Sequence, residues 1–140
     1  MGQLDVRADL SDKRAAMTQP QTRVAIVDDD SSVRKALARL LGAHCFETNT
    51  YESASDFLKS VAINRPACLV LDLHMAGITG LDLQRYLRRA GIEIPTIVVT
   101  AYDEPGIRER CRHAGAAAFL IKPLDSTILI GAINAATGRA

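Results

Sequence analysis

Residues 24–30 read Val-Ala-Ile-Val-Asp-Asp-Asp, a run of four apolar residues that leads directly into three carboxylates. Such a short apolar run is typical of a buried strand. Neighbouring carboxylates repel each other unless a cation lies beside them or the side chains diverge into water. The stretch therefore predicts a strand whose end either binds a cation or faces solvent, and the rest of the chain decides between the two.

The same pattern recurs along the chain. Apolar runs at 68–71, 96–100 and 118–121, with a weaker one at 46–51, alternate with five segments of helical spacing, at 31–41, 53–61, 81–91, 103–115 and 125–134. Strands that are apolar throughout are covered by helices on both faces, which favours a parallel sheet. We therefore expect an α/β fold with a doubly wound, five-stranded parallel sheet.

Several local expectations concern the helices. Ser31 or Ser32 is expected to cap the first helix, and Asp125 or Ser126 the last. Asp103, with a proline two residues later, is expected to open the fourth helix. Leu81, Leu83, Tyr86 and Leu87 mark the third helix, which is expected to end at Gly91.

The composition limits the class of protein. A chain of 140 residues with 48% hydrophobic content suits one globular domain, which we expect at residues 21–138, after a polar N-terminal arm at 1–20. The formal net charge of +1 gives no indication of nucleic-acid binding, and no apolar run is long enough to enter a membrane. Three widely spaced cysteines argue against a disulfide framework and favour a reducing cytoplasm.

Polar residues stop each of the strongly apolar strands. Asp28 and Asp29 follow the first, Asp72 the third, Thr100 ends the fourth, and Lys122 follows the fifth. Each of these residues alone is explained by a cap, a turn or a solvated loop. In a parallel sheet, however, all these strand ends lie at one edge, where ligands bind in open α/β sheets. Together they predict a site for Mg²⁺ in which a carboxylate attacks phosphorus.

The motifs VAIVDDDSSVRKAL, LVLDLHMAGITGLDL, IVVTAYD and AAFLIKPLD resemble the response-regulator receiver domain of two-component signalling, over about residues 22–136. They are similar to receivers of the nitrogen-fixation regulator type. The resemblance implies a flavodoxin-like (βα)5 fold with strand order 2-1-3-4-5. It also implies a signalling switch that catalyses only its own phosphorylation and dephosphorylation, rather than a conventional enzyme.

The resemblance implies a role for individual residues. Asp72 corresponds to the phosphoacceptor, and Mg²⁺, with Mn²⁺ as an alternative, is held by Asp28, Asp29, Asp72 and the backbone carbonyl of His74. Asp30 falls outside this group and is expected to be a surface charge at the start of the helix.

Three further residues and one departure complete the resemblance. Thr100 and Lys122 correspond to the groups that contact the phosphoryl oxygens, and Phe119 to the aromatic switch residue. Ala76 stands where most receivers have proline, from which we expect an altered order of the loop or an altered dephosphorylation rate.

The partners that the resemblance implies are proteins. The phosphoryl donor is a sensor histidine kinase or a phosphotransfer protein, and the output is a downstream protein that binds the face of the fourth helix, fifth strand and fifth helix. A phosphorylation-dependent homodimer is a further expectation, whereas direct nucleic-acid contact and membrane insertion are not expected. The chain ends after the fifth helix, so we expect a single-domain receiver. Two alternatives stay open: a pseudo-receiver that only binds partners, and an Mg²⁺-dependent phosphatase with an aspartate nucleophile.

Overall fold

The computed structural model describes residues 21–139, so the arm expected at residues 1–20 lies outside the described part. Five strands and five helices alternate: β1 (Arg23–Val27), α2 (Ser31–Ala43), β2 (Glu47–Tyr51), α3 (Ala54–Val61), β3 (Cys68–Asp72), α4 (Gly80–Arg89), β4 (Thr96–Thr100), α5 (Ile107–His113), β5 (Ala116–Ile121) and α6 (Ser126–Thr137). The strands form one parallel sheet in the order β2-β1-β3-β4-β5. The predicted fold class and strand order are confirmed.

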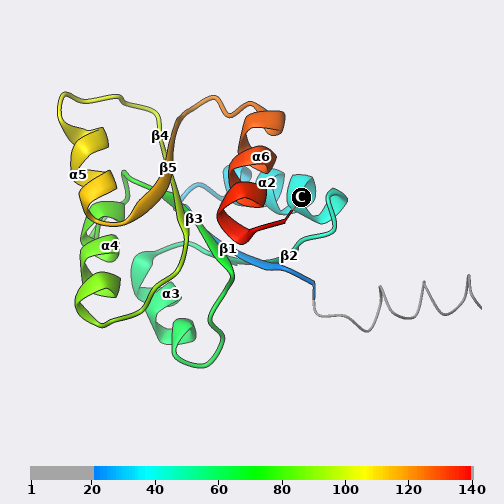
Figure 1. Ribbon diagram of the computed structural model, residues 1–140, viewed down its shortest axis with the longest axis horizontal. Coiled ribbons are helices and arrows are strands. Elements are labelled where there is room, and N and C mark those ends of the chain that lie inside the picture. The colour runs from blue at the N-terminus through cyan, green and yellow to red at the C-terminus, as the bar shows by residue number, and fades with distance from the viewer. Residues whose placement is uncertain (1–20, 140) are drawn as a thin grey trace, which may run out of the picture.

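Helices cover both faces of the sheet. Figure 1 shows α2 and α6 on one face and α3, α4 and α5 on the other. Side chains alternate along each strand, so Val24 and Ile26 of β1 pack under α2 and α6, whereas Ala25 and Val27 pack under α3 and α4. Because both faces are covered, β1, β3 and β4 need apolar residues at nearly every position, as the sequence indicated.

A third, smaller core holds α5 against the sheet. It consists of Leu73, Leu81, Val98, Ile107 and Cys111, with Phe119 partly buried against it. The helix is short, at seven residues, and its interior face contributes two buried side chains. This helix therefore rests on a small set of buried contacts.

The structure corrects the predicted cap of α2. The helix is capped by Asp30, whose carboxylate accepts a hydrogen bond of 2.9 Å from the backbone N–H of Ser32, rather than by Ser31 or Ser32. That hydrogen bond holds the pKa of Asp30 below its usual value. The third carboxylate of the run is thus an exposed helix cap. At α6 the prediction of Asp125 is confirmed, because its side chain accepts from the N–H of Ile128.

One other expectation about the helices is wrong. Asp103 does not open α5, which begins at Ile107 after Gly106 with a φ of +80°. A left-handed residue directly after Pro105 interrupts the helical turn, and Asp103 pairs with Arg108 instead. Tyr86 is 49% exposed, because the leucines of α4 already fill the space against the sheet. None of the helices among residues 21–139 is both long and apolar enough to cross a membrane.

Candidate functional site at the carboxyl edge of the sheet

Three carboxylates meet at the carboxyl edge of the sheet. Asp28, Asp29 and Asp72 each offer an oxygen, and these oxygens lie within 4.8 Å of one another. Asp28 and Asp72 are buried and Asp29 is exposed. They come together because β1 and β3 are adjacent and in register, with Val27 opposite Leu71, so the residues that follow lie side by side. The structure therefore gathers three of the four aspartates that the strand ends contribute, while the fourth caps α2.

The ammonium group of Lys122 lies against two of these carboxylates. Its Nζ is 3.0 Å from Oδ2 of Asp28 and 3.5 Å from Oδ1 of Asp72. The end of β5 is held in place because the backbone N–H of Lys122 donates to the carbonyl of Thr100 over 2.8 Å. The peptide bond between Lys122 and Pro123 is cis. Burial lowers the pKa of Lys122, but the two carboxylates outweigh burial and raise it overall, so the group stays protonated.

The carboxyl group of Asp72 is harder to ionise than an ordinary aspartate. Burial raises its pKa most, and the neighbouring charge of Asp28 raises it further. Lys122 and the backbone N–H of His74 oppose this shift without cancelling it. One ammonium thus faces three carboxylates, and the site retains an excess of negative charge that a divalent cation would offset.

Backbone contacts hold the two buried aspartates. Oδ1 of Asp28 accepts from the N–H of Asp30 over 2.9 Å, and its carbonyl accepts from the guanidinium of Arg34 over 2.8 Å. Beside Asp72, a Cβ on Gly80 would lie 2.5 Å from the Asp72 carbonyl oxygen. Only glycine fits at this point. Sequence reasoning missed the contact of Arg34, for which no pattern gives a signal, and it missed the close approach of the backbone at Gly80.

The hydroxyl of Thr100 is fully buried and turned toward its own loop. Its Oγ1 accepts a hydrogen bond from the N–H of Tyr102 and donates one to the carbonyl of the same residue, both over 3.1 Å. The hydroxyl is therefore satisfied in this structure. Any new hydrogen-bond acceptor at the carboxyl edge competes with the Tyr102 carbonyl for the hydroxyl proton of Thr100.

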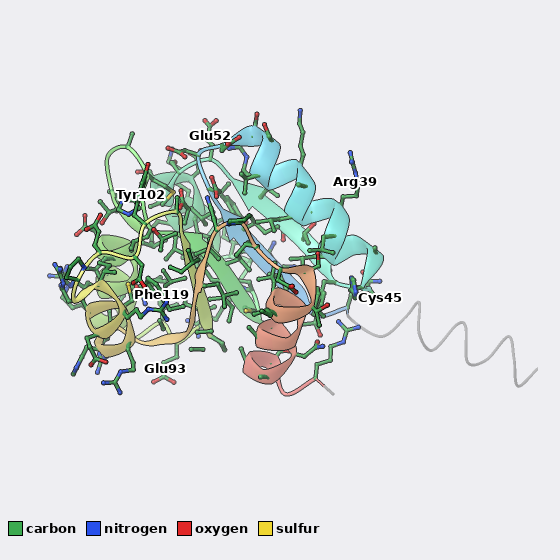
Figure 2. All side chains as sticks on the ribbon, turned by 90° about the horizontal axis from the view of Figure 1, so that it is seen from above. Arg39, Cys45, Glu52, Glu93, Tyr102 and Phe119 are labelled. Carbon is green, nitrogen blue, oxygen red and sulfur yellow. The ribbon has the colours of Figure 1, made fainter. Side chains whose placement is uncertain are left out.

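Phe119 lies one strand further along, on the α5 face of the sheet. Its ring is partly buried, and the guanidinium of Arg108 lies over it at 4.8 Å from the ring centre. Arg108 is also paired with Asp103 over 3.2 Å. Figure 2 shows that Phe119 and Tyr102 lie on the side of the molecule away from Cys45 and Arg39 of the α2 region. Phe119 is thus sandwiched between the small core under α5 and an exposed ion pair.

The imidazole of His74 is engaged with the loop after β4. Its Nε2 lies 3.6 Å from a carboxylate oxygen of Glu104, and its ring meets the edge of Tyr102 at 5.4 Å between centroids. Sequence reasoning considered a role only for the backbone of His74 and missed Glu104 and this bridge between two loops.

The donor set suits a hard divalent cation. Carboxylate oxygens without thiolate or imidazole are the ligands that Mg²⁺ prefers, and it is usually bound through one or two carboxylates and several waters. Asp28, Asp29 and Asp72 meet this requirement by type and by spacing. The residues present therefore fit the cation that the sequence predicted.

Comparison with known proteins identifies the family. A sequence profile of the response regulator receiver domain matches residues 24–134. The chain belongs to this family. Receiver domains of two-component systems are switches that are phosphorylated on an aspartate and bind Mg²⁺ through acidic residues.

Individual relatives agree with this assignment. The transcriptional regulatory protein FixJ of Rhizobium meliloti is 38% identical over 114 residues, which are 81% of this chain and 56% of the relative. The transcriptional regulatory protein TdiR of Thauera aromatica is 37% identical over 123 residues, 88% of this chain and 54% of the relative. This receiver chain therefore spans about half the length of the curated relatives it matches.

Solved structures give the same result. The structure titled FixJ-N has a TM-score of 0.79 and 35% identity, over 87% of this chain and 98% of that one. A response regulator receiver protein from Burkholderia phymatum has a TM-score of 0.76 and 39% identity, over 86% of this chain and 98% of that one. The likeness to nitrogen-fixation regulators expected from the motifs is confirmed.

Proposed function

We propose that this receiver domain takes a phosphoryl group onto Asp72 from the phosphohistidine of a sensor kinase or a phosphotransfer protein. The observation that carries the proposal is the position of the Asp72 carboxylate, at the end of a central strand, within 4.8 Å of two other carboxylates and 3.5 Å from the ammonium of Lys122. A nucleophile, an ion-binding group and a fixed cation for phosphoryl oxygens are thus side by side.

The step is a transfer between two nucleophiles. An oxygen of Asp72 attacks phosphorus, an O–P bond forms, the P–N bond to the imidazole breaks, and its electron pair stays on the imidazole nitrogen. Lys122 is close enough to neutralise charge on the transferred oxygens. Asp28, Asp29, Asp72 and the carbonyl of His74 would hold Mg²⁺ or Mn²⁺, which supplies positive charge to the same oxygens when bound. The domain would catalyse only its own phosphorylation and dephosphorylation.

The switch would follow from the hydroxyl of Thr100. To bind a phosphoryl oxygen, Oγ1 has to give up its hydrogen bond to the carbonyl of Tyr102, which releases the loop before α5. Because α5 rests on a small core that includes Phe119, we propose that the ring moves inward and that the population shifts to a second arrangement. The predicted output face, the fourth helix, fifth strand and fifth helix, corresponds to α5, β5 and α6.

The cellular setting is also a proposal. The free thiols of Cys45, Cys68 and Cys111 support a cytoplasmic location. Two relatives are named as transcriptional regulators and extend beyond the region that matches this chain. A single-domain receiver, a protein partner for its output and a phosphorylation-dependent homodimer therefore stay predictions.

The test is intact-mass measurement after incubation with acetyl phosphate and Mg²⁺. We expect a gain of one phosphate, which is lost in Asp72→Asn and after chelation with EDTA. Asp30→Asn is the matched control, because asparagine still caps α2 and the side chain lies outside the cluster; it should keep the phosphate. Phosphorylation of Asp72→Asn would contradict the assignment. A folded wild type that binds Mg²⁺ but gains no phosphate would favour the pseudo-receiver.

A further inference from the structure

A hollow surface lies beside α4 and the end of α5, where β4 and β5 begin, at the edge of the sheet opposite to the aspartates. An open groove of about 500 Å³ is formed by the C-terminal end of α4, the segment before β4 and the turn before β5. Its apolar lining comes from Leu87, Ile92, Ile94 and Pro95. Its polar lining includes Gln84, Arg88 and the exposed carboxylate of Glu93. Figure 1 shows α4 and α5 side by side on one face of the sheet. We call this surface the α4–α5 groove.

Arginines surround one end of the groove. Arg85, Arg88 and Arg89 line an adjoining hollow together with Asp82, and Arg88 belongs to both. Within residues 21–139, none of these three arginines has a carboxylate oxygen within 4.0 Å. The carboxylate of Asp82 is used by the capping box of α4, where it accepts from the N–H of Thr79. Three exposed cations thus outnumber the two carboxylates of this surface, Asp82 and Glu93, and form no ion pair within the described part of the chain.

Two arginines of α5 differ from those beside the groove. Arg108 pairs with Asp103 and Arg112 with Glu109, and the latter pair lowers the pKa of Glu109. Within residues 21–139, Arg85, Arg88 and Arg89 form no such ion pair.

Hydrogen bonds between the helices hold the walls of the groove. The amide of Gln84, a residue that is 3% exposed, donates from Nε2 to the carbonyl of Cys111 over 3.2 Å. Its Oε1 has no hydrogen-bond partner among the described residues. The guanidinium of Arg88 donates to the carbonyl of His113. The guanidinium of Arg88 is thus already oriented in the free protein, which reduces the conformational entropy lost on binding.

We propose that the α4–α5 groove docks an acidic segment of a partner protein, with an apolar side chain in the groove and carboxylates on Arg85, Arg88 and Arg89. An apolar centre beside charged groups is the usual arrangement of a protein interface. Guanidinium groups match carboxylates in geometry as well as charge.

Two features favour a protein segment over nucleic acid. A phosphodiester chain has no apolar side chain to fill the cavity, and the groove lining includes no aromatic ring on which a base would stack. The formal net charge of +1 also provides no general attraction for a polyanion. The inference goes beyond the proposed phosphorylation and does not depend on it.

The test is an amide NMR titration of the unphosphorylated full chain with a synthetic peptide of alternating acidic residues and leucines. We expect shifts at the C-terminal half of α4, at 92–96 and at 114–115. Two control peptides, with serine in place of leucine or glutamine in place of the acids, should each bind more weakly. Because Arg85, Arg88 and Arg89 are exposed, their ion pairs with the peptide carboxylates are screened by salt, and the affinity for the peptide should fall as the salt concentration rises.

Variants locate the site. Arg85→Ser with Arg89→Ser should weaken Kd about tenfold or more, and Ala114→Leu, which fills the groove, should also weaken it. The charge-matched control is Lys35→Ser with Arg39→Ser on α2, where both side chains are exposed, and it should change Kd by less than about twofold. Arg39 is labelled in Figure 2 on the opposite side of the molecule from Tyr102.

Four results would overturn the proposal. The shifts could fall outside the groove, or the glutamine peptide could bind equally well. A single-stranded oligonucleotide or vesicles of anionic lipid could bind the groove more tightly than the peptide, which would make phosphate the ligand. Groove shifts that depend on protein concentration without peptide would identify a second copy of the chain as the occupant. Each of these results is independent of whether Asp72 is phosphorylated.

Discussion

The carboxyl edge of the sheet has three carboxylates close together and the α4–α5 groove has three arginines beside it, yet the two regions tolerate these like charges for different reasons. At the edge, two carboxylates are buried, and Lys122 lies within 3.5 Å of both. At the groove, the arginines are exposed, and water and salt screen them. A buried cluster of like charges needs an opposite charge within the fold, whereas an exposed cluster is stable in water without one.

The largest expected difference concerns packing. Gly80→Ala adds one methyl group at the carboxyl edge, where it would lie 2.5 Å from the Asp72 carbonyl oxygen and 2.9 Å from the Cα of Leu73. We expect a loss of about 3 kcal/mol in the free energy of unfolding and a large loss of phosphorylation, because backbone must move. Ala114→Leu adds more atoms at the open groove and should change stability by about 0.5 kcal/mol or less. Urea unfolding of both variants measures the contrast, and equal stabilities would remove it.

The next comparison removes one cation from each region. Lys122→Met leaves Asp28 and Asp72 without their ammonium and should cost about 2 kcal/mol at neutral pH. Arg89→Met should cost about 0.5 kcal/mol or less, because its side chain is exposed and has no carboxylate partner in the described chain. The cost of Lys122→Met should be smaller near about pH 3 than at neutral pH, because the carboxyl of Asp72, whose pKa is raised, takes up a proton at low pH. A cost that is the same at both pH values would mean that the lysine acts through packing alone.

The smallest effect is the pH dependence that Asp72 contributes. Its pKa is raised in the folded state, chiefly by burial and by Asp28, so the unfolded chain releases this proton first as pH rises. Without a divalent cation, the contribution of Asp72 to the free energy of unfolding therefore falls as the pH rises from 3.8, the ordinary pKa of aspartate, through the raised pKa of the folded state. Above the raised pKa this contribution is constant. Asp72→Asn removes this loss and should be more stable than wild type by on the order of 1 kcal/mol at pH 7.

Unfolding with EDTA between about pH 3 and pH 7 measures this difference, which should grow across the range. Mg²⁺ should then stabilise wild type and leave Asp72→Asn less affected. If wild type is the more stable protein at pH 7 without any cation, the carboxylates are already balanced and the cluster has no need of a metal.

Much of the fold could be predicted from the sequence because it depends on local patterns. The apolar runs at 24–27, 68–71 and 96–100 are short, continuous and stopped by polar residues, and this identifies strands that are buried on both faces. The helix ends were less predictable. Asp30 rather than Ser31 caps α2, and Gly106 delays α5, because several residues near each end can adopt the capping position and only the backbone path selects one.

The sequence by itself determined the parallel α/β fold and the gathering of Asp28, Asp29, Asp72 and Lys122, because parallel strands bring their carboxyl ends to one edge. Only the tertiary structure decided the contacts between distant segments. These are the close approach of the Asp72 backbone to Gly80, which leaves no room for a methyl group, the contact between His74 and Glu104, and the position of the arginines beside an apolar groove. These depend on how helices pack across the sheet, and side chains from different segments carry no sequence signal of their distance in space.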